Sequence, residues 1–88
     1  MIQQEIIVSN TFGIHARPAS LIAQMSAKFK ADIRLEKDGV SANAASIMNV
    51  MMLAASYKSK LVIKAQGPDE KQAVDALVGL FNSKFHEE

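Results

Sequence analysis

Apolar side chains recur along this chain at two spacings, and each spacing predicts a different kind of element. A short apolar run at 6–8 stands before the turn-forming Ser9 and Asn10, and it predicts a first strand. From Ala16 onward the apolar positions return every three or four residues, as one face of a helix requires. Pro18 falls in the first turn, where a missing N–H costs little. This predicted face comprises Pro18, Leu21, Ile22, Met25 and Phe29.

The middle of the chain predicts a β-hairpin. Ile33 and Leu35 alternate with polar residues, and the Asp38-Gly39 dipeptide is typical of a tight hairpin turn. The return strand alternates at Val40, Ala42 and Ala44. We therefore expect antiparallel pairing in the middle of the sheet.

The rest of the chain adds a short helix, a strand and a longer helix. Ser46 is a residue type that caps helix N-termini, and an apolar segment follows it. The segment 60–67 alternates as a strand, whereas 68–85 is amphipathic, with Pro68 near its start and acidic residues in its first turn. The order strand, helix, strand, strand, helix, strand, helix predicts a two-layer α+β fold with its helices on one face of the sheet.

Composition narrows the class of protein. The chain has 88 residues, of which 49% are hydrophobic and 22% charged, so we expect residues 1–88 to form a single domain with one core. It has no cysteine, and its two histidines lie far apart, so we expect no disulfide, no bound metal and no cofactor.

Charge and hydropathy limit the partners. A net charge of +1, with one tyrosine and no tryptophan, argues against a nucleic-acid partner. No apolar run could span a bilayer, and the N-terminal segment lacks the features of a signal peptide. We therefore expect a cytoplasmic protein with no membrane partner.

The segment GIHARP places a histidine and an arginine at the start of the first predicted helix. A helix N-terminus offers unpaired amides and partial positive charge, which together suit a phosphate. The imidazole of His15 could act as a nucleophile, and the guanidinium of Arg17 could grip phosphoryl oxygens. The amides of Ala16 and Arg17 would stay available, whereas Pro18 has none. These parts favour phosphoryl transfer through a phosphohistidine.

A simpler interpretation is also open on the residues alone. His15 could merely cap the helix while Arg17 is solvated, because single histidines near helix ends are common. Against this, a cation at a helix N-terminus opposes the helix dipole, which suggests that Arg17 has a function there.

Three stretches, GIHARPAS, SIMNVMML and GPDEKQAVDALVGLF, resemble the HPr family, the histidine-containing phosphocarriers of the bacterial phosphoenolpyruvate-dependent phosphotransferase system. The match runs in register over essentially the whole chain. The resemblance implies an HPr-like open-faced β-sandwich, in which a four-stranded antiparallel sheet carries three helices on one face. It also implies a phosphocarrier rather than an enzyme. Nothing in the sequence indicates more than a monomer, so we expect a monomer.

The resemblance further implies a role for each motif residue. His15 would accept a phosphoryl group on Nδ1 from Enzyme I and pass it to a histidine or cysteine of an EIIA domain, for sugar uptake and regulation. Arg17 would stabilise that group, beside the backbone amides of Ala16 and Arg17. A regulatory branch of the family has glutamine at the histidine position, whereas this chain has the histidine.

The second predicted helix is apolar on nearly every side. Ile47, Met48 and Met51 share one side of it, and for an unknown protein these residues would be expected to fill gaps in a core. The resemblance implies instead that they form an exposed docking patch for Enzyme I and EIIA domains.

Ser46 has two interpretations. As an N-cap it needs no further role. In Gram-positive relatives the matching serine is phosphorylated by an ATP-dependent HPr kinase, which adds negative charge beside the docking patch. Many of those relatives have lysine before the serine and glycine after the methionine, whereas this chain has Ala45 and Asn49. Regulation at Ser46 therefore stays open.

Two alternatives to a sugar-system carrier remain. The stretches MMLAAS and GLFNSKFHEE resemble NPr, the nitrogen-branch carrier, which serves a regulatory EIIA. A binding module in which His15 is never phosphorylated is the alternative from a different class.

Overall fold

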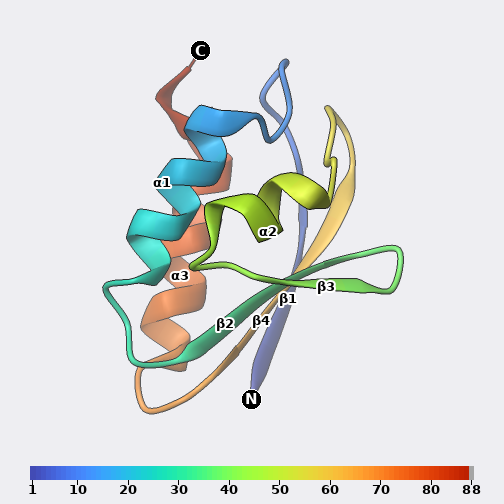
Figure 1. The fold of residues 1–88 in the computed structure, drawn as a ribbon. Coiled ribbons are helices and arrows are strands. Elements are labelled where there is room, and N and C mark those ends of the chain that lie inside the picture. The colour runs from blue at the N-terminus through green and yellow to red at the C-terminus, as the bar shows by residue number, and fades with distance from the viewer. Residues whose placement is uncertain (88) are drawn as a thin grey trace.

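The computed structural model of the protein describes residues 1–87. Its elements follow the predicted order, and Figure 1 shows the helices gathered on one side of a twisted sheet. The strands are β1 (Ile2–Ile7), β2 (Asp32–Lys37), β3 (Val40–Asn43) and β4 (Lys60–Gln66). The helices are α1 (Ala16–Ser26), α2 (Ile47–Met52) and α3 (Glu70–Asn82), followed by the short turn η1 (Lys84–His86).

The sheet has the strand order β1-β4-β2-β3, and each neighbouring pair is antiparallel. Strands β1 and β4 are distant in sequence, yet they pair along the whole length of β1, with Gln4 opposite Ile63. Strands β2 and β3 form the predicted hairpin. Its turn residues Asp38 and Gly39 have φ of 51° and 81°, the positive values that a tight hairpin turn with the twist of its strands requires. The predicted hairpin is confirmed.

Alternation along the inner strands turns one face of the sheet toward the helices. Ile33 and Leu35 of β2 are buried, whereas Arg34 between them is exposed. The same alternation in β4 buries Leu61 and Ile63. Side chains from the sheet and the helices then form one core, which confirms the predicted two-layer α+β fold with its helices on one face. Fully buried members of this core include Ile22, Leu35, Leu61, Ile63, Leu77, Phe81 and Phe85.

The first strand begins earlier than its apolar run predicts. It starts at Ile2 rather than at 6, and the intervening residues 3–5 are polar and exposed because β1 lies at an edge of the sheet. Val8 follows the strand and is fully buried. Phe29, which the spacing assigned to the first helix, lies beyond the end of α1 and packs against the core.

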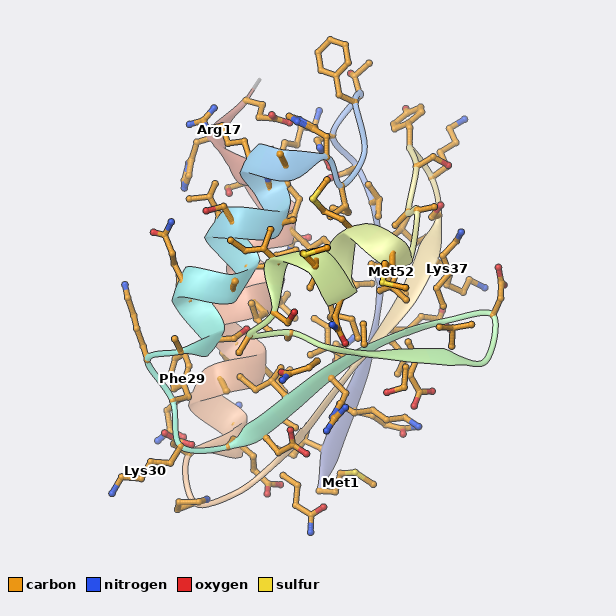
Figure 2. The ribbon with its side chains drawn as sticks, viewed as in Figure 1. Met1, Arg17, Phe29, Lys30, Lys37 and Met52 are labelled. Atoms are coloured by element: carbon orange, nitrogen blue, oxygen red, sulfur yellow. The ribbon has the colours of Figure 1, made fainter. Side chains whose placement is uncertain are left out.

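A carboxylate joins the C-terminal end of α1 to the start of α3. Asp69 is the N-cap residue of α3, but its side chain makes no bond to its own helix. It accepts backbone N–H bonds from Lys30 and Ala31, each 2.8 Å long. The bond from Lys30 is the main cause that holds the pKa of Asp69 below its ordinary value of 3.8. In Figure 2 Lys30 lies at the opposite end of the molecule from Arg17.

Candidate functional site: the start of α1

The loop before α1 is held against the segment that follows α2. The Gly13 N–H donates to the Asn10 carbonyl at 3.1 Å, and the Ile14 N–H donates to the Ala55 carbonyl at 2.9 Å. Gly13 has φ of +68°, and a Cβ there would lie 2.7 Å from the Ala55 oxygen. Only glycine fits this position without a shift of the backbone. The loop therefore places His15 close to the C-terminal end of α2.

His15 is the N-cap residue of α1. Its backbone is extended, with φ of −89° and ψ of −168°, and its carbonyl accepts the Ala19 N–H at 3.0 Å. Its side chain makes no hydrogen bond to the helix, so His15 caps α1 through its backbone alone and its imidazole takes no part in the cap. The amides of Ala16 and Arg17 donate no hydrogen bond within residues 1–87, and Pro18 carries no N–H. The helix therefore presents two donors beside the histidine.

Arg17 adds a positive charge to the same end of the helix. Its side chain is exposed and forms no ion pair with any residue in the range 1–87. Figure 2 shows it projecting outward from the start of α1, at the end of the molecule opposite Lys30. An anion bound there would gain a guanidinium as well as the helix amides.

The imidazole of His15 is oriented by two neighbours. Its side chain is 43% exposed, and its Nε2 lies 2.7 Å from Oε2 of Glu87. The ring of Phe12 stands edge-on to it, with the ring centroids 6.3 Å apart. A carboxylate can only accept, so Nε2 carries the proton of this contact, and in the neutral imidazole the lone pair is then on Nδ1. Nδ1 makes no hydrogen bond within the described chain.

Asn10 and Glu87 also belong to the site, although the sequence predicts a functional role for neither of them. Asn10 is fully buried, and its Nδ2 donates to the Gly13 carbonyl at 2.7 Å and to Oε1 of Glu87 at 3.0 Å. By its sequence Asn10 is an ordinary turn residue, and Glu87 lies in a polar stretch. The signal that could have found Glu87 is Phe85, a large apolar residue in that stretch, which is fully buried.

Helix α2 presents an apolar surface to solvent. We call this surface the methionine face, and it comprises Ile47, Met48, Met51 and Met52, which are exposed by 42%, 73%, 42% and 79%. The alternative in which these residues fill gaps in the core is therefore wrong. The buried residue of α2 is Val50, which turns the opposite side of the helix to the core.

Both ends of α2 are capped by side chains. Ser46 is the N-cap residue, as the sequence predicts, and its Oγ accepts the Asn49 N–H at 3.3 Å. At the other end Nζ of Lys37 donates to the carbonyls of Leu53 and Ala54, at 3.1 and 3.4 Å. These bonds hold a six-residue helix that would be marginal by itself.

A comparison with known proteins identifies the family. Residues 2–83 match the family model described as the PTS HPr component phosphorylation site. The chain belongs to the HPr family. The phosphocarrier protein HPr of Treponema pallidum is 44% identical over 88 residues, which cover 100% of both chains. The HPr-like protein Crh of Bacillus subtilis is 44% identical over 77 residues, covering 88% of this chain and 91% of Crh.

Solved structures confirm the HPr-like fold. HPr-C-His from Thermoanaerobacter tengcongensis matches with a TM-score of 0.96 at 44% identity, covering 100% of this chain and 99% of that one. An HPr dimer from the same organism matches with a TM-score of 0.78 at 44% identity, over 97% of this chain and 98% of its own. Because some solved relatives are dimers, the monomeric state of this chain stays a prediction. The helices in residues 1–87 are too short or too polar for any of them to cross a membrane.

Proposed function

We propose that this member of the HPr phosphocarrier family, acting as one domain over residues 1–88, carries a phosphoryl group on Nδ1 of His15. The group would come from phospho-Enzyme I and pass to an EIIA domain. The observation that supports this most directly is the placement of His15, whose imidazole stands at the N-terminus of α1 without capping it. Its Nε2 is engaged by Glu87, which leaves Nδ1 as the nucleophile.

The chemistry needs little beyond position and charge. Nδ1 attacks the phosphorus of a phosphohistidine on the donor, the donor N–P bond breaks, and its electron pair stays with the donor nitrogen. Arg17 and the amides of Ala16 and Arg17 offset the charge of the phosphoryl oxygens in a loose transition state. In the second transfer a histidine or cysteine of the EIIA domain attacks the phosphorus, and the bond from Nδ1 to phosphorus breaks. The protein is thus modified and restored in each cycle, as a carrier rather than an enzyme.

The methionine face is proposed as the docking surface for Enzyme I and EIIA domains, through Ile47, Met48 and Met51. The bond from the Ile14 N–H to the Ala55 carbonyl ties the loop before His15 to the segment after α2. A partner that covers α2 would therefore also reach the histidine. Flexible methionine side chains suit a surface that must fit more than one partner.

Regulation at Ser46 by an HPr kinase is proposed as a further property of the same surface. Its Oγ already accepts the Asn49 N–H and the Asn49 side-chain amide at 3.1 Å. A phosphoryl group there would add about −2 charge at the start of α2, which the helix tolerates but an acidic partner surface would not.

The nitrogen branch is the alternative function. The stretches MMLAAS and GLFNSKFHEE favour it, and it changes the identity of the Enzyme I and EIIA partners but not the chemistry at His15. Supplying both kinds of Enzyme I in parallel tests which donor the chain accepts.

The deciding experiment follows labelled phosphate from phosphoenolpyruvate through Enzyme I to the protein. The wild type should take up acid-labile, base-stable label, and His15→Ala should take up none. His86→Asn is the matched control, because it removes the other histidine and asparagine tolerates positive φ. A wild type that stays unlabelled with both kinds of Enzyme I, each shown to be active on another carrier, would leave the binding-module interpretation.

A further inference from the structure

The chain makes a left-handed turn after α3. Lys84, Phe85 and His86 have φ of 56°, 55° and 59°. This is the left-handed region of backbone conformation, which residues other than glycine and asparagine rarely adopt. Phe85 is fully buried, and its ring lies 4.9 Å from the ring of Phe81, centroid to centroid. The buried ring thus holds an unfavourable backbone in place. Such held strain tends to occur where a segment must be aimed at a functional group.

The turn aims Glu87 at the candidate site. Its side chain is only 10% exposed, and its two carboxylate oxygens are engaged by Nε2 of His15 and Nδ2 of Asn10. A carboxylate withdrawn from water is costly unless hydrogen bonds replace the lost hydration. Here each of the two oxygens has a donor, and one donor is the imidazole itself.

Asn10 fixes the direction of that carboxylate. Its Nδ2 donates to the Gly13 carbonyl and to Glu87, and both of these partners can only accept. The reversed amide would set its oxygen against two acceptors, so the orientation of Asn10 is determined. A fully buried amide thereby connects the loop before α1 to Glu87.

We propose that Glu87, held by Asn10, is a positioning residue that keeps the His15 proton on Nε2 and so keeps the lone pair on Nδ1. The inference rests on the proposed function and deepens it. When Nδ1 forms its bond to phosphorus, the donor N–P bond breaks and the His15 ring becomes cationic, with its proton still on Nε2. The carboxylate stabilises that cation. On transfer to the acceptor, the Nδ1–P electron pair returns to Nδ1, and no proton has to move in either step.

The test compares Glu87→Gln with the wild type. An amide in place of the carboxylate cannot accept from both His15 and Asn10, because one of its two ends is a donor. We expect ring ¹⁵N NMR shifts to show a protonated Nε2 in the wild type and a mixture of tautomers in Glu87→Gln. Transfer from phospho-Enzyme I should slow roughly tenfold, the effect of losing a charge-assisted bond to a half-exposed ring.

The matched control is Glu5→Gln, which makes the same chemical change on the exposed edge strand β1. It should leave both the ring ¹⁵N shifts and the transfer rate as in the wild type, and far-UV circular dichroism should show the same fold for both variants.

Two outcomes would overturn the inference, and they differ in what else they overturn. A wild type that is labelled normally beside an equally fast Glu87→Gln, with Nε2 still protonated, would overturn the role of Glu87 alone. A wild type that accepts no phosphoryl group from either Enzyme I would overturn the proposed function and this inference with it.

Discussion

Two carboxylates, one on each side of α3, reach across to the segments that flank α1. Asp69 precedes α3 and accepts backbone N–H bonds from Lys30 and Ala31, just after α1. Glu87 follows α3 and accepts from the side chains of Asn10 and His15, just before α1. The two ends of the helical layer are thus tied by the same chemical group in different ways.

The difference lies in the donors. Every residue except proline has a backbone N–H, so the bonds to Asp69 constrain the path of the loop and little else. The bonds to Glu87 come from particular side chains, and one of them belongs to the proposed phosphoryl acceptor. The Asp69 end therefore constrains the fold, whereas the Glu87 end connects the fold to the imidazole of the proposed phosphoryl acceptor.

Phe85→Ala should have the largest effect, because it removes the buried ring that holds η1 and directs Glu87. Truncating a fully buried phenylalanine costs about 3 kcal/mol or more of unfolding free energy, measured by urea denaturation. Release of Glu87 should also bring the His15 ring to a mixture of tautomers. Phe12→Ala is the control, since its ring is 77% exposed, and a similar loss of stability there would contradict this account.

Gly13→Ala should come next, because the loop before His15 has no room for a side chain. Positive φ together with the close approach to the Ala55 oxygen should cost about 2 kcal/mol of unfolding free energy and slow phosphoryl transfer. Gly39→Ala separates the two causes, since its φ is +81° but a Cβ at that position would meet nothing within 4 Å. It should lose only about 1 kcal/mol and transfer at the wild-type rate.

A third comparison concerns α2, where the side chain of Ser46 caps the helix beside the methionine face. Ser46→Ala should lower the unfolding free energy by about 1 kcal/mol, whereas Ser46→Asp should keep most of it, because aspartate is also a good N-cap. Ser46→Asp should nevertheless slow transfer from Enzyme I, since it adds negative charge near the methionine face. Equal transfer rates for Ser46→Asp and the wild type would argue against regulation by charge at this position.

Asp69→Asn should have the smallest effect on transfer and a distinctive pH dependence of stability. The pKa of Asp69 is lowered in the folded protein by the backbone bond from Lys30, and that of Glu70 by the bond from the Gly67 N–H. Groups with lowered pKa stabilise the fold fully above their ordinary values of 3.8 and 4.5 and lose that contribution as the pH falls through the folded values. The variant should therefore melt below the wild type at neutral pH, and the gap should close in acid. A gap that persists in acid would mean that the Asp69 carboxylate charge is not its cause.

The elements that the sequence predicts well are those whose signals are local. The hairpin at Asp38-Gly39, the N-cap at Ser46 and the start of the first helix each depend on a few neighbouring residues, and the structure has all three. The start of β1 was missed because an edge strand carries polar residues that hide the alternation.

The contacts of the candidate site were harder to predict because they join distant segments. The motif around His15 is continuous in sequence, so its chemistry and its family resemblance were visible. The hydrogen bond between Asn10 and Glu87 joins residues 77 positions apart, and it depends on a turn in which three successive residues have positive φ. No local preference indicates such a turn, since the contacts that hold it, the burial of Phe85 and the bonds of Glu87 to Asn10 and His15, form only in the folded chain.

The edge-on contact between Phe12 and His15 makes position 12 a suitable place for a fluorescent probe of the imidazole. The chain contains no tryptophan, and the ring of Phe12 is exposed while lying against the imidazole. An indole introduced by Phe12→Trp would be the sole strong fluorophore of the protein, next to the ring that we propose accepts the phosphoryl group. Its emission would then report the arrival and departure of the phosphoryl group continuously, without a radioactive label.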